Sequence, residues 1–203
     1  IAAGSPKVKA MSTLEWPTEE QFATADVIFL YQHPKCLSDT KHQQQIEAFL
    51  HRGGGLVLSH YVLWNASPKI QELLGLGKGK DSQYKHKVVS LKVPDPRHAI
   101  MLGLPEAFTL ADECYWKMQG DRSKVTALAT SDETVGDKVS AEPVIWTHQY
   151  GKGRVVASTL GHFDWSFDDP YFRAILLRGI AWSAGESPYC FDPLILRGIP
   201  LNE

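Results

Sequence analysis

The chain has 203 residues, of which 43% are hydrophobic and 22% are charged, the ordinary balance of a globular protein. Its formal net charge of −2 offers no basic surface for nucleic acid or for an anionic membrane. No apolar run reaches the ~18 residues that span a bilayer, and three cysteines without CxxC spacing argue against a disulfide framework and a cysteine zinc site.

The first half of the chain alternates between short apolar runs and amphipathic segments. Strands are predicted over residues 25–31 and 56–58, because both runs are short and apolar with β-branched residues. Helices are predicted over residues 40–51 and 68–74. The short connections between these elements predict a parallel sheet covered by helices.

Both helices carry recognisable ends. Ser38 or Asp39 is expected to cap the first helix, and the glycines at 53–55 are expected to end it. Ser67 is expected to cap the second helix, which Gly75 ends.

The second half is less regular. Strands are predicted over residues 87–93 and 125–130, and the polar stretch 131–141 is expected to be an exposed loop. Residues 143–148 and 154–160 predict a hairpin, whose turn is formed by Gly151, Lys152 and Gly153.

The chain is expected to end in a helix and a tail. Asp169 and Pro170 predict the start of a helix that continues to about Ala184, and residues 186–203 form a proline-containing tail. No internal repeat or second domain is recognisable, so residues 1–203 are interpreted as one domain.

Residues that follow strands are the first candidates for chemistry, because ligands in open α/β sheets bind beyond the carboxyl ends of the strands. His60 follows the predicted strand 56–58, at the kind of turn where hydrolases and amidotransferases carry a nucleophile. Here the turn offers Ser59 or His60, without the glycines of a GxSxG elbow. A histidine that only hydrogen-bonds within a loop is the alternative.

Two further positions combine chemistry-bearing residues. Residues 112–116 place two carboxylates beside two aromatic rings, a combination typical of sugar sites, although an exposed surface turn is favoured from this pattern alone. His162 follows the apolar run 155–160, and Gly161 before it permits close backbone approach. His162 is therefore a candidate metal ligand or general base, with a histidine at the edge of the core as the alternative.

His60, Glu113 and His162 would together form a set of two histidines and one carboxylate, which suits a divalent metal such as zinc. No local HxxxH spacing supports a metal, so the sequence leaves the cofactor open. Cys36 and Cys114 lie at no recognisable nucleophile elbow and are interpreted as structural. Neither glycine run opens a helix that would bind a phosphate.

Several stretches, taken together and in order, resemble the ThuA-like (trehalose utilisation) family. They are Gly53-Gly54-Gly55-Leu56-Val57 with His60, His98-Ala99-Ile100 with Gly103-Leu104, Asp112-Glu113-Cys114-Tyr115, Pro143 to Val155, Leu160-Gly161-His162, and Asp169-Pro170 through Gly185.

The resemblance implies a class I glutamine amidotransferase-like fold, which is an α/β, flavodoxin-like three-layer sandwich with a mostly parallel sheet. It also implies a link to sugar metabolism. Ser59-His60 stands where amidotransferases carry their nucleophilic cysteine, which argues against glutamine hydrolysis. Relatives begin with a strand, a histidine-bearing loop and a helix that this chain is expected to lack, so that residues 8–11 would form its first strand.

The leading hypothesis is a carbohydrate-processing enzyme of hydrolase or isomerase type. His60 and His162 would serve as acid–base groups or metal ligands, and Glu113 as an acid–base group or a ligand of sugar hydroxyls. The groups expected to contact the sugar are Tyr61, Tyr115, Trp116, Asp164 and Trp165.

The competing hypothesis is a non-catalytic carbohydrate-binding or scaffold module on an inherited enzyme fold. Either way, the expected partner is a small-molecule carbohydrate, with no nucleic acid and no membrane. A homo-oligomer and either a cytoplasmic or a periplasmic location stay open.

Overall fold

The computed structural model describes residues 8–31, 33–64 and 66–195. The helices are α1 (Glu19–Thr24), α2 (Thr40–His51), α3 (Pro68–Leu74), α4 (Pro170–Ser183) and α5 (Asp192–Ile195). The strands are β1 (Val27–Leu30), β2 (Gly55–Ser59), β3 (Leu76–Gly77), β4 (Gln83–Lys92), β5 (Ala107–Trp116), β6 (Gln119–Gly120), β7 (Val125–Val135), β8 (Lys138–Tyr150) and β9 (Gly153–Ser158). No helix in these ranges is long and apolar enough to cross a membrane.

Seven strands form one sheet in the order β1-β2-β9-β8-β7-β4-β5, and β3 pairs with β6 apart from it. Only the β1–β2 and β2–β9 pairs are parallel, whereas the other four neighbouring pairs are antiparallel. The expectation of a mostly parallel sheet is therefore wrong. Tight turns between β7 and β8 and between β8 and β9 cause the difference, because a two-residue connection can join only antiparallel strands.

The polar stretch 131–141 was expected to be an exposed loop. In the structure it forms the paired ends of β7 and β8, so this expectation is wrong. Its buried face is itself polar. Glu133 is 5% exposed and accepts hydrogen bonds from the Ser131 hydroxyl and the Lys87 ammonium. The alternation of buried and exposed residues is therefore present here, but hydrophobicity does not reveal it.

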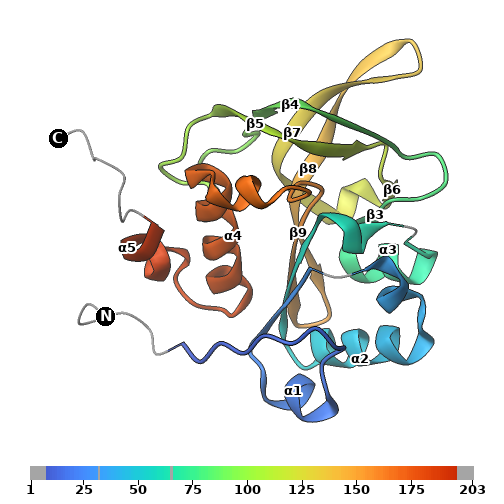
Figure 1. The fold of residues 1–203 in the computed structure, drawn as a ribbon, viewed down its shortest axis with the longest axis vertical. Coiled ribbons are helices and arrows are strands. Elements are labelled where there is room, and N and C mark those ends of the chain that lie inside the picture. The colour runs from blue at the N-terminus through green and yellow to red at the C-terminus, as the bar shows by residue number, and fades with distance from the viewer. Residues whose placement is uncertain (1–7, 32, 65, 196–203) are drawn as a thin grey trace.

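Helices cover both faces of the parallel part of the sheet (Figure 1). α2 and α3 pack on one face, where Leu56 and Leu58 of β2 join their apolar side chains. Val57 points to the other face and packs with α4 and with the antiparallel strands. Because successive side chains of a strand point to opposite faces, β2 contributes to both layers of the core and is completely buried.

The predicted helix starts are confirmed. Asp39 caps α2, Ser67 caps α3, and Asp169 caps α4 by accepting the amide hydrogens of residues 171 and 172. α1 was not predicted, although Thr18 and Gln21 form a capping box that marks its start. The expected strand 8–11 is not formed.

The expected tail is structured in its first part. A short 3-10 turn (Pro188–Phe191) precedes α5, and residues 196–203 lie outside the described part of the chain. Arg178 of α4 makes two hydrogen bonds, 2.9 and 2.8 Å long, to the carboxylate of Asp192. This partly buried bidentate pair holds the segment against α4.

Candidate functional site

The first residue of the site follows β2 at a strained turn. His60 opens a 3-10 turn (His60–Leu63) directly after β2, with a φ of 57°. Residues other than glycine rarely adopt this left-handed backbone conformation, and such backbone strain is concentrated at functional positions. The imidazole is 3% exposed, and burial lowers the pKa of His60 below its ordinary value. The predicted place of His60, at a sharp turn after a strand, is confirmed.

The second element is β5, where a surface turn was favoured and the structure has a buried strand instead. Glu113 and Tyr115 are two residues apart and therefore share one face of this strand. β4 pairs with it so that His86 lies opposite Glu113 and Tyr84 opposite Tyr115. The strand was overlooked because its buried residues include two carboxylates, which hide the apolar pattern.

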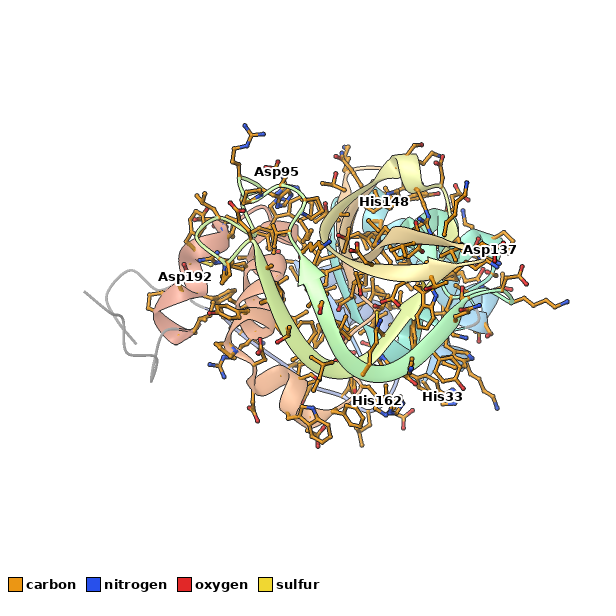
Figure 2. All side chains as sticks on the ribbon, turned by 90° about the horizontal axis from the view of Figure 1, so that it is seen from above. His33, Asp95, Asp137, His148, His162 and Asp192 are labelled. Carbon is orange, nitrogen blue, oxygen red and sulfur yellow. The ribbon has the colours of Figure 1, made fainter. Side chains whose placement is uncertain are left out.

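The third element is the loop after β9, which three neighbours hold in place. A Cβ added at Gly161, whose φ is 108°, would lie 2.4 Å from the Ser59 hydroxyl, so the close approach predicted for this glycine is confirmed. The Asp112 carboxylate accepts the amide hydrogens of Gly161 and His162, at 2.6 and 3.0 Å. The Tyr31 hydroxyl donates to the Gly161 carbonyl at 2.9 Å. Figure 2 shows the curved β4–β5 ribbon passing this loop.

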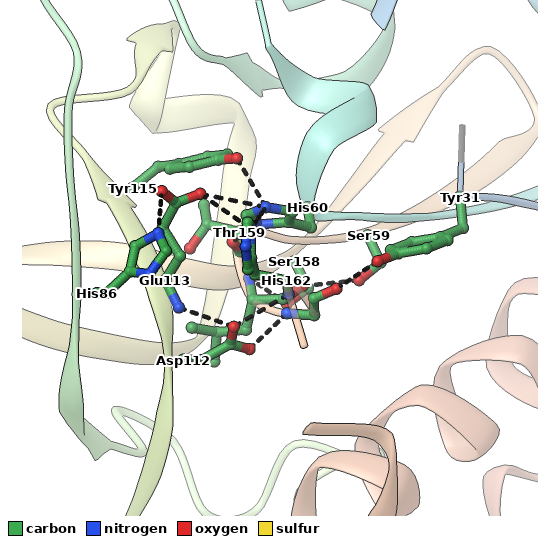
Figure 3. A network of polar contacts seen from close by, with 12 residues as sticks. Tyr31, Ser59, His60, His86, Asp112, Glu113, Tyr115, Ser158, Thr159 and His162 are labelled. Atoms are coloured by element: carbon green, nitrogen blue, oxygen red, sulfur yellow. Dashed lines mark hydrogen bonds and ion pairs between the residues drawn. The ribbon is translucent and has the colours of Figure 1, made fainter. Parts of the chain in front are cut away.

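The three predicted groups converge, although they come from distant parts of the chain (Figure 3). His60 Nε2 lies 2.9 Å from His162 Nδ1. Glu113 Oε2 lies 3.2 Å from His60 Nε2 and 3.4 Å from His162 Nδ1. Two imidazole nitrogens and a carboxylate oxygen at these distances can hold a metal ion or share a proton.

Further groups fix the orientation of this triad. The Thr159 carbonyl accepts from His60 Nδ1 at 3.0 Å, and His86 Nε2 lies 2.8 Å from Glu113 Oε1. The Tyr115 hydroxyl lies 2.9 Å from His60 Nε2. Burial, followed by the charge of Glu113, raises the pKa of Tyr115, so its hydroxyl stays protonated.

The triad lies in a pocket of about 420 Å³ with predominantly aromatic walls. The residues that line it are Tyr31, His60, Tyr61, Trp64, Tyr84, Glu113, Tyr115 and His162. Lys78, only 7% exposed, lies behind this wall with its ammonium 3.5 Å from the centre of the Trp64 ring. Burial lowers the pKa of Lys78.

Five of the predicted site residues therefore lie in the pocket wall, and three do not. Trp116 points away from Tyr115 and donates its indole hydrogen to the Thr134 carbonyl. Trp165 is 56% exposed and stacks on Phe163, with 4.1 Å between the ring centres, and Asp164 begins the short turn that carries it.

Sequence reasoning missed Tyr31, Trp64, Tyr84 and His86. Tyr31 follows β1 directly, so the rule that selected His60 and His162 would also have selected Tyr31. His86 and Tyr84 reach the site through strand register, which the sequence alone does not reveal.

The cysteines are not part of this site. Burial raises the pKa of Cys36 to about 11 and that of Cys114 to about 12. A thiol with so high a pKa is a poor nucleophile, in agreement with the structural role expected for both.

A family model described as ThuA, trehalose utilisation, matches residues 3–183. The chain belongs to the ThuA family. The description of this family supports a general role in carbohydrate utilisation. No curated protein shows significant similarity to the chain.

Solved structures share the fold of this ThuA family member. A putative ThuA-like protein from Parabacteroides merdae is 21% identical, with a TM-score of 0.64 over 82% of this chain and 73% of that chain. A second, from Bacteroides uniformis, is 19% identical, with a TM-score of 0.62 over 84% of this chain and 75% of that chain. A β-galactosidase from a Rahnella species is 20% identical, with a TM-score of 0.54 over 77% of this chain and 22% of that chain.

Proposed function

We propose that this protein is an enzyme that acts on a sugar, a glycoside or an oxidised (keto) sugar in the pocket around His60, Glu113 and His162. The observation that carries the proposal is the meeting of two imidazoles and a carboxylate within 3.4 Å at the base of an aromatic pocket. The membership of the ThuA family supports the carbohydrate class of the substrate.

The pocket wall suits a sugar ring. Aromatic rings stack on the apolar faces of pyranoses, and Tyr61, Trp64 and Tyr84 present such rings. Hydroxyl and carboxylate groups bind sugar hydroxyls, and Tyr115 and Glu113 offer them at the base. A volume of about 420 Å³ lies in the usual range for small-molecule sites.

The triad suits proton transfer at a hydroxyl or next to a carbonyl. Histidine and glutamate are the most frequent general acids and bases, and here they lie within reach of one bound oxygen atom. A metal ion held by the same groups would polarise that oxygen instead. Glutamine hydrolysis is not proposed, because no cysteine occupies the turn after β2.

The direct test is a screen of glycosides and keto-glycosides for turnover by the wild-type protein. His60→Ala and His162→Ala are expected to lose turnover of any substrate found. His51→Ala is the matched control, because His51 is 59% exposed at the end of α2, before β2, whereas His60 follows β2, and His51 does not line the pocket. Unchanged turnover in both site variants would show that the site is assigned wrongly.

A non-catalytic carbohydrate-binding module is the second candidate. It is favoured by the β-galactosidase from Rahnella, in which a region of similar fold makes up 22% of the chain. Sugar binding that requires Trp64 and Tyr84, without turnover of any compound in the screen, would support the module over the enzyme.

A further inference from the structure

The hydrogen bonds of His60 leave two acceptor atoms, His60 Nε2 and Glu113 Oε2, facing each other. A carbonyl oxygen can only accept, so the 3.0 Å contact with the Thr159 carbonyl requires a hydrogen on His60 Nδ1. When the ring donates this hydrogen and carries no second one, His60 Nε2 is an acceptor. Glu113 Oε2, also an acceptor when ionised, lies only 3.2 Å from it.

The neighbouring donors do not fill this gap. His162 Nδ1 and the Tyr115 hydroxyl both lie 2.9 Å from His60 Nε2, and the ring nitrogen has a single lone pair to share between them. The Tyr115 hydroxyl also hydrogen-bonds to Glu113, so the donors can serve the two acceptors separately, but this leaves the 3.2 Å contact between Glu113 Oε2 and His60 Nε2 unbridged. A cation at the point that the three groups face would satisfy all of their lone pairs at once.

The distances match a set of metal ligands. Metal–ligand bonds of about 2.0–2.2 Å place neighbouring ligand atoms about 2.9–3.5 Å apart, for octahedral and tetrahedral angles respectively. The three observed separations are 2.9, 3.2 and 3.4 Å.

The surroundings match the second layer of contacts that a metal site requires. Metal-binding histidines donate their other ring hydrogen to a carbonyl or carboxylate, as His60 Nδ1 does to Thr159. Ligating carboxylates are themselves hydrogen-bonded, as Glu113 is through Oε1 to His86. His86 thus occupies one carboxylate oxygen and leaves Oε2 directed at the two ring nitrogens.

We propose that His60 Nε2, His162 Nδ1 and Glu113 Oε2 bind one divalent first-row metal ion, with His86 as a positioning residue. Nitrogen and oxygen donors of this kind suit Zn²⁺ and Mn²⁺. Three protein ligands leave coordination positions for an oxygen of water or of a sugar, and all three ligands line the aromatic pocket. The metal site involves the residues of the proposed function, but binding of the metal does not depend on the sugar.

The test is a metal titration of protein without a histidine tag, after treatment with a chelator and dialysis. Zn²⁺ and, in parallel, Mn²⁺ are titrated in competition with a chromogenic chelator, and Co²⁺ is added as a spectroscopic substitute. We expect the wild type to bind one equivalent and to develop visible Co²⁺ absorption bands. His162→Ala and Glu113→Gln should weaken binding by more than about 100-fold, beyond the 10–100-fold loss expected for His86→Ala.

His51→Ala, which keeps the number of histidines equal to that in His162→Ala, should bind as the wild type does. His162 has a side chain that is 36% exposed, so its removal is compatible with folding, which circular dichroism checks. The proposal is overturned if the wild type binds neither metal stoichiometrically, or if His162→Ala binds as tightly as the wild type. Sugar turnover by a protein that binds neither metal would overturn the metal site alone, whereas a bound metal without sugar binding would refute only the proposed function.

Discussion

The left-handed backbone at His60 has a cost that can be measured separately from the loss of the imidazole. An L-residue in this conformation costs about 1–2 kcal/mol, whereas glycine adopts it freely. We compare His60→Ala with His60→Gly, both without the ring, and Val62→Ala with Val62→Gly as the reference pair. Val62 lies in the same 3-10 turn, is completely buried, and does not have a positive φ.

At both positions, the alanine variant should have a higher free energy of unfolding than the glycine variant, because it buries a methyl group and lowers the entropy of the unfolded chain. Only at position 60 does alanine also carry the left-handed strain. The advantage of alanine should therefore be about 1–2 kcal/mol smaller at position 60 than at position 62.

Urea unfolding in the presence of a chelator gives the four free energies without a contribution from metal. In thermal unfolding, the same difference corresponds to roughly 2–8 °C for a domain of this size. Equal advantages of alanine at the two positions would refute the argument that the turn at His60 is strained.

Three further predictions concern the frame of the site and the stability of the fold. Ile175→Ala should lower the free energy of unfolding by about 2–5 kcal/mol, because Ile175 is completely buried and its loss leaves a cavity; denaturant titration measures this. Gly161→Ala should abolish Zn²⁺ or sugar binding while the core strands stay folded, because the added Cβ collides with Ser59; wild-type binding would contradict it. Burial raises the pKa of Glu142, but hydrogen bonds from Arg122 and a backbone amide outweigh it and hold the pKa below the ordinary 4.5. A depressed folded-state pKa stabilises the protein at pH values above 4.5, so the stability lost in Glu142→Gln should shrink as the pH falls through the lower folded-state value. Urea titrations from pH 7 to 3 measure this loss of stability, and a loss that does not change with pH would contradict the prediction.

The sequence predicted the elements whose hydrophobic pattern and end signals agree. β1, β2, α2, α3, α4 and the hairpin of β8 and β9 fall close to their expected places. The same local signals predicted where His60 and His162 lie, because a residue directly after a buried strand must lie at the end of the sheet. Thus the half of the site that belongs to the parallel strands was predictable.

The other half depends on long-range pairing and on polar burial. β5 buries Asp112 and Glu113, and the second half of β7 buries Glu133, so neither stretch shows the apolar alternation on which the prediction relied. The direction of β7 follows from its tight turn to β8, but a long connection joins β4 to β5. The register that brings His86 opposite Glu113 therefore depends on contacts that are distant in the sequence.

The site exists because the antiparallel extension of the sheet turns back over the end of its parallel part. The parallel strands β2 and β9 lead into the turn of His60 and the loop of His162, but neither strand contains an acidic residue. β5 supplies the carboxylate of Glu113, and its neighbour Asp112 fastens β5 to the His162 loop through two amide hydrogens. A buried carboxylate that accepts these hydrogens and the amide hydrogen of Glu113 ties both halves together. Asp112 therefore fixes the His162 loop against β5, and the Thr159 carbonyl after β9 holds His60. These contacts explain how residues some 50 to 100 positions apart keep separations of 2.9–3.4 Å.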